Sequence, residues 1–172
     1  MTDKMQVEGN HATIAAEARS TGDAAVEGLL AGFAAGVFMA LYLVLTGLVS
    51  GSAPAQTLAR FNPGSSDSPL SGALMHMAVS GVYGALYGIL YQNILRHLFR
   101  NRVPGWLAGA AYGIVLFVFA TIVLLPGNNS PLREIPALQF GIAHLLYGLV
   151  LGALTDRALN KRNIVPVSDR LV

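Results

Sequence analysis

Four long stretches of this sequence contain no charged residue. They lie between Glu27 and Arg60, between Asp67 and Arg96, between Arg102 and Arg133, and between Glu134 and Asp156. An α-helix rises about 1.5 Å per residue, so roughly 20 apolar residues cross a hydrocarbon core about 30 Å thick. Each stretch is at least that long, and the pattern predicts an all-α, polytopic membrane protein with four transmembrane helices.

We place the four spans at about residues 26–50, 70–92, 105–126 and 136–156. Charged residues make up 12% of the chain, about half the share of a soluble domain. A soluble bundle of four buried helices is the alternative, but each predicted helix is apolar on all its faces, which favours lipid. The polar, weakly patterned residues 1–25 are predicted to form a flexible cytoplasmic arm, and residues 157–172 a cytoplasmic tail.

Lysine and arginine are distributed unequally between the two ends of the predicted helices. The arm, the loop between the second and third spans and the tail hold nine of them, whereas the other side holds only Arg60 and Arg133. Because cytoplasmic segments carry the excess of these residues, both termini are predicted to be cytoplasmic, in a multi-pass protein of the cell inner membrane. No basic face interleaved with aromatic residues is present, so we expect no nucleic-acid partner.

The two halves of the chain repeat the same pattern. The first span reads GLLAGFAAG from Gly28 and the third reads GWLAGAAYG from Gly105, an offset of 77 residues. The second span reads HMAVSGVYG from His76 and the fourth reads HLLYGLVLG from His144, an offset of 68 residues, because the first outer loop is longer. We therefore expect two helical hairpins, related as parallel repeats by a pseudo-two-fold axis along the membrane normal.

Small residues recur at every fourth position in all four spans. In lipid, helices gain little from hydrophobic contact, and small residues at this spacing let their backbones approach closely. We interpret these positions as helix-packing seams, an interpretation that requires no further function. The predicted packing residues are Gly28, Gly32, Gly36, Ser80, Gly84, Gly88, Gly105, Gly109, Gly113, Gly148 and Gly152.

His76 and His144 lie at matching positions of the repeat, roughly 10–12 Å below the outer surface. An ionisable side chain inside a membrane indicates a function by default. Two neutral imidazoles that face each other could bind the iron of a b-type haem axially, with Arg60 and Arg133 pairing its propionates. The simpler alternative is a structural hydrogen bond from each ring to a neighbouring helix, and a third is contact with protons or a quinone.

The remaining sequence offers little chemistry. The absence of cysteine excludes disulfides, thiolate-bound metals and covalently attached haem, and no nucleophile–base pair can be named. We therefore expect a non-catalytic structural or accessory subunit of a larger membrane assembly, whose partners are the lipid bilayer and other membrane subunits or copies of itself. The alternative is an electron-transfer protein with haem b on His76 and His144. A small carrier or channel is a weaker alternative, because no carboxylate lies within a span.

Three segments of the chain resemble a group of small, uncharacterised bacterial membrane proteins with four spans. They are GLLAGFAAGVFMA in the first span, GALMHMAVSGVYGALY in the second and AHLLYGLVLGAL in the fourth. Members of the group pair a histidine with glycine steps in the second and fourth spans. The resemblance covers about residues 26–156. It implies the same four-span fold, and it brings no activity, cofactor or partner with it.

Overall fold

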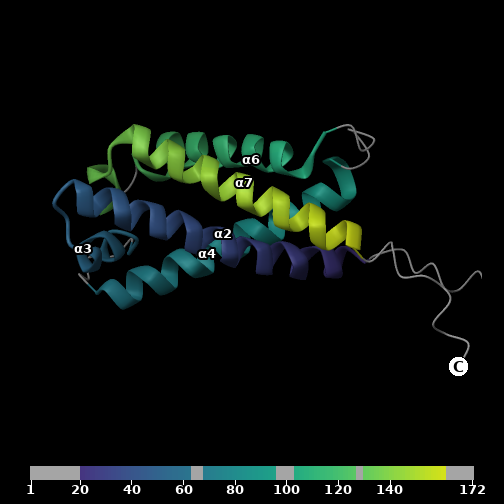
Figure 1. Ribbon diagram of the computed structural model, residues 1–172, viewed down its shortest axis with the longest axis horizontal. Helices are drawn as coiled ribbons and strands as arrows, with labels where there is room; N and C mark the ends of the chain where they lie inside the picture. The colour runs from purple at the N-terminus through teal and green to yellow at the C-terminus, as the bar shows by residue number, and fades with distance from the viewer. Residues whose placement is uncertain (1–19, 63–67, 96–102, 127–129, 162–172) are drawn as a thin grey trace, which may run out of the picture.

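The computed structural model describes residues 20–62, 68–95, 103–126 and 130–161, and all regular structure within these ranges is helical (Figure 1). The four long helices are α2 (Thr21–Val49), α4 (Pro69–Leu90), α6 (Gly105–Phe119) and α7 (Ala137–Lys161). Two π-helical segments extend them, η1 (Tyr91–Leu95) after α4 and η2 (Ala120–Leu124) after α6. The short helix α3 (Pro54–Ala59) and the 3-10 helix η3 (Pro131–Glu134) lie at one end of the bundle, which we call the α3 end.

The four predicted spans are confirmed. The segments Thr21–Val49, Pro69–Leu95, Gly105–Leu124 and Ala137–Leu159 are each long and apolar enough to cross a membrane. Large apolar side chains on their outer faces, among them Leu45, Val82 and Ile122, expose more than half of their surface. Such an apolar outer surface suits contact with lipid acyl chains rather than with water.

The first helix begins earlier than predicted. α2 starts at Thr21, so residues 21–25, which we assigned to the arm, belong to the helix. A capping box defines this start. The Ser20 hydroxyl accepts from the Asp23 backbone N–H at 3.1 Å, and the Asp23 carboxylate accepts from the Ser20 N–H at 3.4 Å. α7 likewise continues beyond residue 156 to Lys161; the rest of the predicted arm and tail lies outside the described residues.

The predicted outer loop 51–69 contains a helix that we did not expect. Pro54 occupies the first turn of α3, where its missing N–H breaks no helical hydrogen bond, and the Gln56 side chain accepts from the Ala53 N–H at 3.0 Å. α3 packs against both α2 and α4, and its Thr57 is buried. Six residues are too few to show an apolar helical period, which is why periodicity did not reveal this element.

Within each hairpin the two helices meet along their small residues. A methyl group added at Gly32 would overlap the Gly84 backbone, and one added at Gly109 would overlap the Gly152 backbone. Gly32 corresponds to Gly109 in the repeat and Gly84 to Gly152, so the two hairpins pack in the same register. The other predicted packing residues take part in these two seams: Gly28, Gly36, Ser80 and Gly88 in the first, and Gly105, Gly113 and Gly148 in the second.

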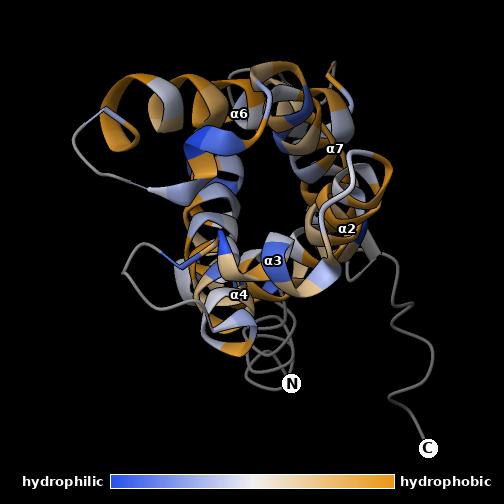
Figure 2. Ribbon diagram, turned by 90° about the vertical axis from the view of Figure 1, so that its left-hand side faces the viewer, coloured by the Kyte–Doolittle hydropathy of each residue, from blue (hydrophilic) through white to orange (hydrophobic). Residues whose placement is uncertain are grey.

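The two contacts between the hairpins are unequal. Viewed along the bundle, the helices follow one another around a ring as α4, α2, α7 and α6 (Figure 2). α2 packs directly against α7, whereas the backbones of α4 and α6 stay apart. A two-fold axis would make these two contacts equivalent. The repeat therefore keeps its symmetry in the register within each hairpin and departs from it between the hairpins.

We call the α2–α7 contact the closed side of the bundle, and the side where α4 and α6 stay apart the open side. Tyrosine side chains bridge the open side between α4 and the second hairpin. Three hydroxyl groups donate to backbone carbonyl oxygens across it: Tyr87 to Gly105 at 3.2 Å, Tyr112 to Tyr83 at 2.9 Å and Tyr147 to Ser80 at 2.7 Å. At the positions equivalent to Tyr87 and Tyr112, the closed side carries Thr155 and Ala35, both fully buried. Small side chains thus accompany the closed contact, and tyrosines hold the open one apart.

Candidate functional site

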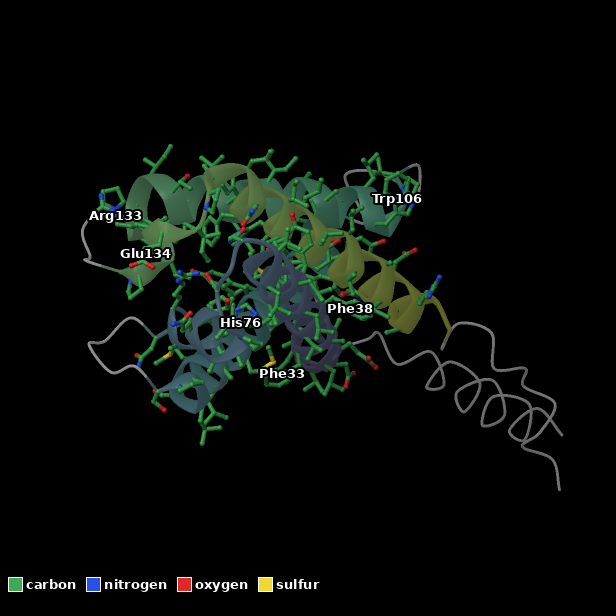
Figure 3. The ribbon with its side chains drawn as sticks, turned by 60° about the vertical axis from the view of Figure 1, so that its left-hand side comes forward. Phe33, Phe38, His76, Trp106, Arg133 and Glu134 are labelled. Atoms are coloured by element: carbon green, nitrogen blue, oxygen red, sulfur yellow. The ribbon has the colours of Figure 1, made fainter. Side chains whose placement is uncertain are left out.

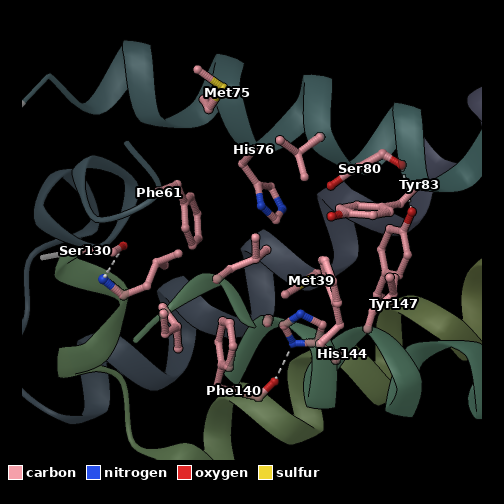
Figure 4. A pocket seen from close by; sticks show the side chains of 17 residues that line it. Met39, Phe61, Met75, His76, Ser80, Tyr83, Ser130, Phe140, His144 and Tyr147 are labelled. Atoms are coloured by element: carbon pink, nitrogen blue, oxygen red, sulfur yellow. Dashed lines mark hydrogen bonds between the residues drawn. The ribbon is translucent and has the colours of Figure 1, made fainter. Parts of the chain in front are cut away.

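A cavity of about 290 Å³ lies on the open side of the bundle (Figure 4). Its walls come from α4, from α6 with η2, and from the first half of α7, while Met39 reaches it from α2 and Phe61 from the segment after α3. Both predicted site histidines, His76 and His144, line this cavity. The structure therefore brings together the two imidazoles that the repeat singled out.

The two histidines enter the cavity at the same depth. His76 is the eighth residue of α4 and His144 the eighth residue of α7, so each lies about 10 Å along its helix from the α3 end. Figure 4 shows the two rings extending into the cavity from opposite sides. A bound molecule would therefore have one imidazole on each side of it.

His76 is held by a hydrogen bond to another helix. Its Nε2 lies 3.0 Å from the carbonyl oxygen of Gly36 on α2. The ring of Phe61 stacks on the imidazole, with centroids 4.5 Å apart and planes inclined by 23°. Because a carbonyl oxygen only accepts, Nε2 carries the proton, and the neutral ring presents the lone pair of Nδ1.

His144 is held by its own helix. Its Nδ1 lies 2.8 Å from the carbonyl oxygen of Phe140, one turn earlier in α7. The Phe140 ring meets the imidazole edge-on, with centroids 4.4 Å apart and planes inclined by 71°. The proton is therefore on Nδ1, and the lone pair is on Nε2. Within the described residues, neither Nδ1 of His76 nor Nε2 of His144 has a hydrogen-bond partner.

The rest of the lining is apolar or carries hydroxyl groups. Ser80, Tyr83, Ser130 and Tyr147 contribute the hydroxyls, and apart from the two imidazoles the remaining surface is formed by aromatic, aliphatic and methionine side chains. No aspartate, glutamate, lysine or arginine among the described residues lines the cavity. This combination of a mostly apolar wall and a few convergent polar groups is typical of small-molecule sites.

The cavity opens through the outer surface of the bundle between α4 and α6. Four apolar residues line it and also leave 40–43% of their surface exposed: Met75 and Val79 on α4, and Phe119 and Leu124 on α6 and η2. These four side chains form the rim of the opening, and the surface around it is apolar. The rim includes part of the π-helical segment η2, a type of irregularity that is frequent at functional sites.

Arg60 and Arg133 lie away from this cavity. Arg60 donates from Nε to the Glu134 carboxylate at 3.1 Å and from Nη1 to the Ser52 hydroxyl at 3.4 Å, and it lines a separate cavity of about 240 Å³. Arg133 is exposed on η3, at the α3 end (Figure 3). The structure therefore does not bring the predicted propionate partners together with the histidines. The Arg60–Glu134 pair instead connects the two hairpins at the α3 end.

Several residues of the cavity and of the open side around it were missing from our sequence-based prediction. Tyr112 and Tyr147 correspond to Ala35 and Val79 in the repeat, so the two copies differ in side-chain size at the places where the hairpins meet. Such differences between otherwise matching copies would have identified these tyrosines. Phe61 lies in a loop outside the repeat, and no sequence pattern pointed to its stacking on the imidazole.

Comparison with known proteins gives a family and no function. No curated protein and no solved structure matches this chain. The profile of DUF6789, described as a family of unknown function, matches residues 22–165, a range that contains nearly all of the four long helices and both cavity histidines. The chain therefore belongs to the DUF6789 family.

Proposed function

We propose that this protein is a non-catalytic membrane protein that binds a hydrophobic small molecule in the cavity between its two hairpins. The observation that carries the proposal is the inequality of the two hairpin contacts. The repeat offers a closed arrangement on both sides, yet tyrosines keep one side open around two histidines. An unfilled space in a helix bundle forfeits dispersion contacts, so a bound molecule accounts for the cavity better than helix packing alone.

The position of the opening supports uptake from the bilayer. Its rim lies in the apolar outer surface of the helices, at the depth where acyl chains would surround the protein. A molecule dissolved in the membrane could pass between Val79 and Phe119 without crossing a polar surface. A charged molecule would be excluded, because the lining offers no opposite charge to compensate for its lost hydration.

Co-purification tests this proposal. The protein is purified in a mild detergent, and bound molecules are extracted with organic solvent and identified by mass spectrometry. We expect a bound compound in stoichiometric amount, and we expect Ala120→Phe, which places a ring in the cavity, to abolish it. Ala111→Phe, on the exposed face of α6, is the control and should retain the compound. A wild-type protein that carries and takes up no small molecule would refute the proposal.

A b-type haem is a second candidate, and it is supported by the same two imidazoles. Nδ1 of His76 and Nε2 of His144 each offer a lone pair, as axial ligation requires, and the hydrogen bond from Nδ1 of His144 to a carbonyl oxygen is common among metal-bound histidines. Visible spectra of the oxidised and reduced protein test it. Haem predicts a Soret band that is lost in His76→Ala and in His144→Ala, and a colourless preparation from haem-replete cells excludes it.

We further propose that the protein is an accessory subunit of an assembly in a bacterial inner membrane. The exposed apolar faces of its helices, which could contact other membrane subunits, support this role, and an isolated monomer in mild detergent with no copurifying partner would contradict it. The excess of lysine and arginine on one side supports cytoplasmic termini. Because the chain has no cysteine, Ser52→Cys would report the orientation, and we expect an impermeant maleimide to label it from outside the cell membrane.

A further inference from the structure

The hydrogen bonds that hold the two histidines also determine what their free nitrogens can do. Nε2 of His76 and Nδ1 of His144 both donate to backbone carbonyl oxygens. To donate into the cavity as well, either ring would have to become charged, or to exchange its tautomer and leave that carbonyl oxygen without a donor. No carboxylate among the described residues lines the cavity to stabilise a charged ring. Each imidazole therefore presents a hydrogen-bond acceptor to the cavity, and a complementary ligand must carry hydrogen-bond donors.

The other polar groups of the lining do not alter this requirement. The Tyr147 hydroxyl already donates to the Ser80 carbonyl oxygen. The side-chain hydroxyls of Ser80 and Tyr83 have no hydrogen-bond partner among the described residues, and the Ser130 hydroxyl accepts from the Leu132 N–H at 3.3 Å. Each of these three hydroxyls can donate to a ligand or accept from it. Only the two imidazole nitrogens are restricted to one role, so they decide which ligand is selected.

We propose that the cavity binds an uncharged, lipid-soluble ring of the hydroquinone class, whose two hydroxyl groups donate to Nδ1 of His76 and Nε2 of His144. This inference rests on the proposed function and names its ligand class. Two hydroxyls on opposite sides of one ring match two acceptors that enter the cavity from opposite sides. The aromatic side chains of Phe61 and Phe140 beside the imidazoles suit a flat ring.

The opening gives the ligand a direction. A ring placed between the imidazoles can extend an apolar tail between the α4 rim and the α6 rim, past Val79 and Phe119, into the surrounding acyl chains. Only the ring then has to fit inside the protein, because the tail lies among the acyl chains. This agrees with the cavity volume of about 290 Å³, which is close to the lower limit for small-molecule sites.

The same geometry discriminates against the oxidised form of the ligand. A quinone carries carbonyl oxygens and no donors, so its lone pairs would face the lone pairs of both imidazoles. Sites built to bond a hydroxyl group strongly reject analogues that lack it, because their own polar groups are left unpaired. We expect the hydroquinone to bind at least about tenfold more tightly than the quinone with the same tail.

Equilibrium binding to the full chain in lipid nanodiscs tests the inference. The probes are decylhydroquinone kept reduced with ascorbate, decylbenzoquinone, and the dimethyl ether of decylhydroquinone, which keeps the ring and tail but has no donor. Retained probe is quantified by chromatography against empty nanodiscs. We expect saturable binding of the hydroquinone and at least about tenfold weaker binding of the other two. Equal or tighter binding of the quinone or the ether overturns the inference.

Two variants connect the preference to the histidines. His76→Leu and His144→Leu each remove one acceptor and should reduce the preference for the hydroquinone, whereas the Ala111→Phe control should preserve it. Helical content and gel-filtration behaviour establish whether each variant folds, and the ether comparison on the wild-type protein decides the question if one does not. A preference that survives both changes in folded protein overturns the inference.

The outcomes also separate this inference from the function on which it rests. If another extracted compound binds and Ala120→Phe abolishes its binding, while no hydroquinone preference exists, the hydroquinone inference fails and the proposed function stands. If Ala120→Phe binds every probe as well as the wild-type protein does, the cavity is not the binding site and both fail.

Discussion

The α2–α7 contact and the α4–α6 contact occupy equivalent places in the repeat, but only the first is closed. Ala35 and Thr155 are fully buried at the closed contact, whereas Tyr112 and Tyr87 stand at the equivalent positions of the open one. The glycine seams that set the backbone register within each hairpin are the same in both halves. A duplicated bundle can therefore keep its backbone arrangement and open one side through a few side-chain differences.

The surroundings of the two histidines also differ through single side chains at equivalent positions of the repeat. His144 bonds the carbonyl oxygen of Phe140 and packs against its ring, but the position equivalent to Phe140 in the first hairpin is Gly72. A methyl group at Gly72 would overlap the Leu58 carbonyl oxygen of α3. The longer first loop thus brings α3 against α4 at this glycine. Phe61, which follows α3, packs its aromatic ring against His76 in place of the ring that Phe140 provides for His144.

The largest loss of stability is expected from substitutions in the glycine seams, where the two hairpins are most alike. Gly84→Ala and its counterpart Gly152→Ala each place a methyl group against the backbone of the facing helix, and we expect each to lower the free energy of unfolding by about 3 kcal/mol. Unfolding in mixed detergent and SDS micelles, followed by circular dichroism, measures this. Gly141→Ala is the control, because its methyl group would lie 3.5 Å from the Phe117 ring, an ordinary contact. A stability loss in only one hairpin would show that their seams are not equivalent.

The next largest loss of stability is expected when Ala35 at the closed contact is replaced by tyrosine, the residue found at the equivalent position of the open side. Ala35→Tyr forces a large side chain into the α2–α7 contact and is expected to destabilise the protein by about 2 kcal/mol. Val37→Tyr, on the exposed face of α2, should change the stability little. A variant as stable as the control would mean that side-chain size does not keep this side closed.

The reverse exchange should close the open side. In Tyr112→Ala we expect α4 and α6 to approach the interaxial distance of directly packed helices, about 8–10 Å. Spin labels at Val82→Cys and Ile114→Cys, on the exposed faces of these helices, report the change by pulsed electron resonance, and the chain has no other cysteine to label. An unchanged distance distribution would show that Tyr112 does not hold the helices apart.

A smaller effect is expected from single hydroxyl groups on the open side. Tyr147→Phe removes the hydrogen bond to the Ser80 carbonyl oxygen and should cost about 0.6 kcal/mol, and at most about 2 kcal/mol. The control is Tyr42→Phe, because the Tyr42 hydroxyl has no hydrogen bond among the described residues. The same micelle unfolding assay applies, and equal stability of the two variants would argue against a role of this bond in holding the hairpins together.

The smallest effect is expected at the α3 end. Arg60 and Glu134 join the loops of the two hairpins at this end, but the side chains are 23% and 64% exposed, so solvent screens their attraction. We expect Glu134→Gln to cost less than about 1 kcal/mol, and the difference from wild type to shrink at high salt. A larger loss that is independent of salt would place the restraint between the hairpins in this ion pair.

The four spans were predictable because a helix that crosses the lipid bilayer must be long and free of charged residues, and both properties are visible in the sequence. The pairing of His76 with His144 was predictable because the repeat carries it. The start of α2 and the helix α3 depend on local caps around Ser20 and Pro54, which a search for apolar stretches passes over. The cavity itself depends on which of two matching positions carries the larger side chain, and that is a tertiary property.

The unequal hairpin contacts also make the bundle mechanically anisotropic. Separating α4 and η1 from the second hairpin breaks three hydroxyl–carbonyl hydrogen bonds, each worth about 0.6 kcal/mol in a membrane, and the bond from the Tyr91 hydroxyl to the Asp156 carboxylate, but it leaves both glycine seams intact. Separating α2 from α7 would instead unpack a whole helix–helix contact. The softest deformation is therefore a rotation of one hairpin against the other about the α2–α7 contact. That rotation widens the passage between Val79 and Phe119, so the direction of greatest compliance coincides with the proposed route into the cavity.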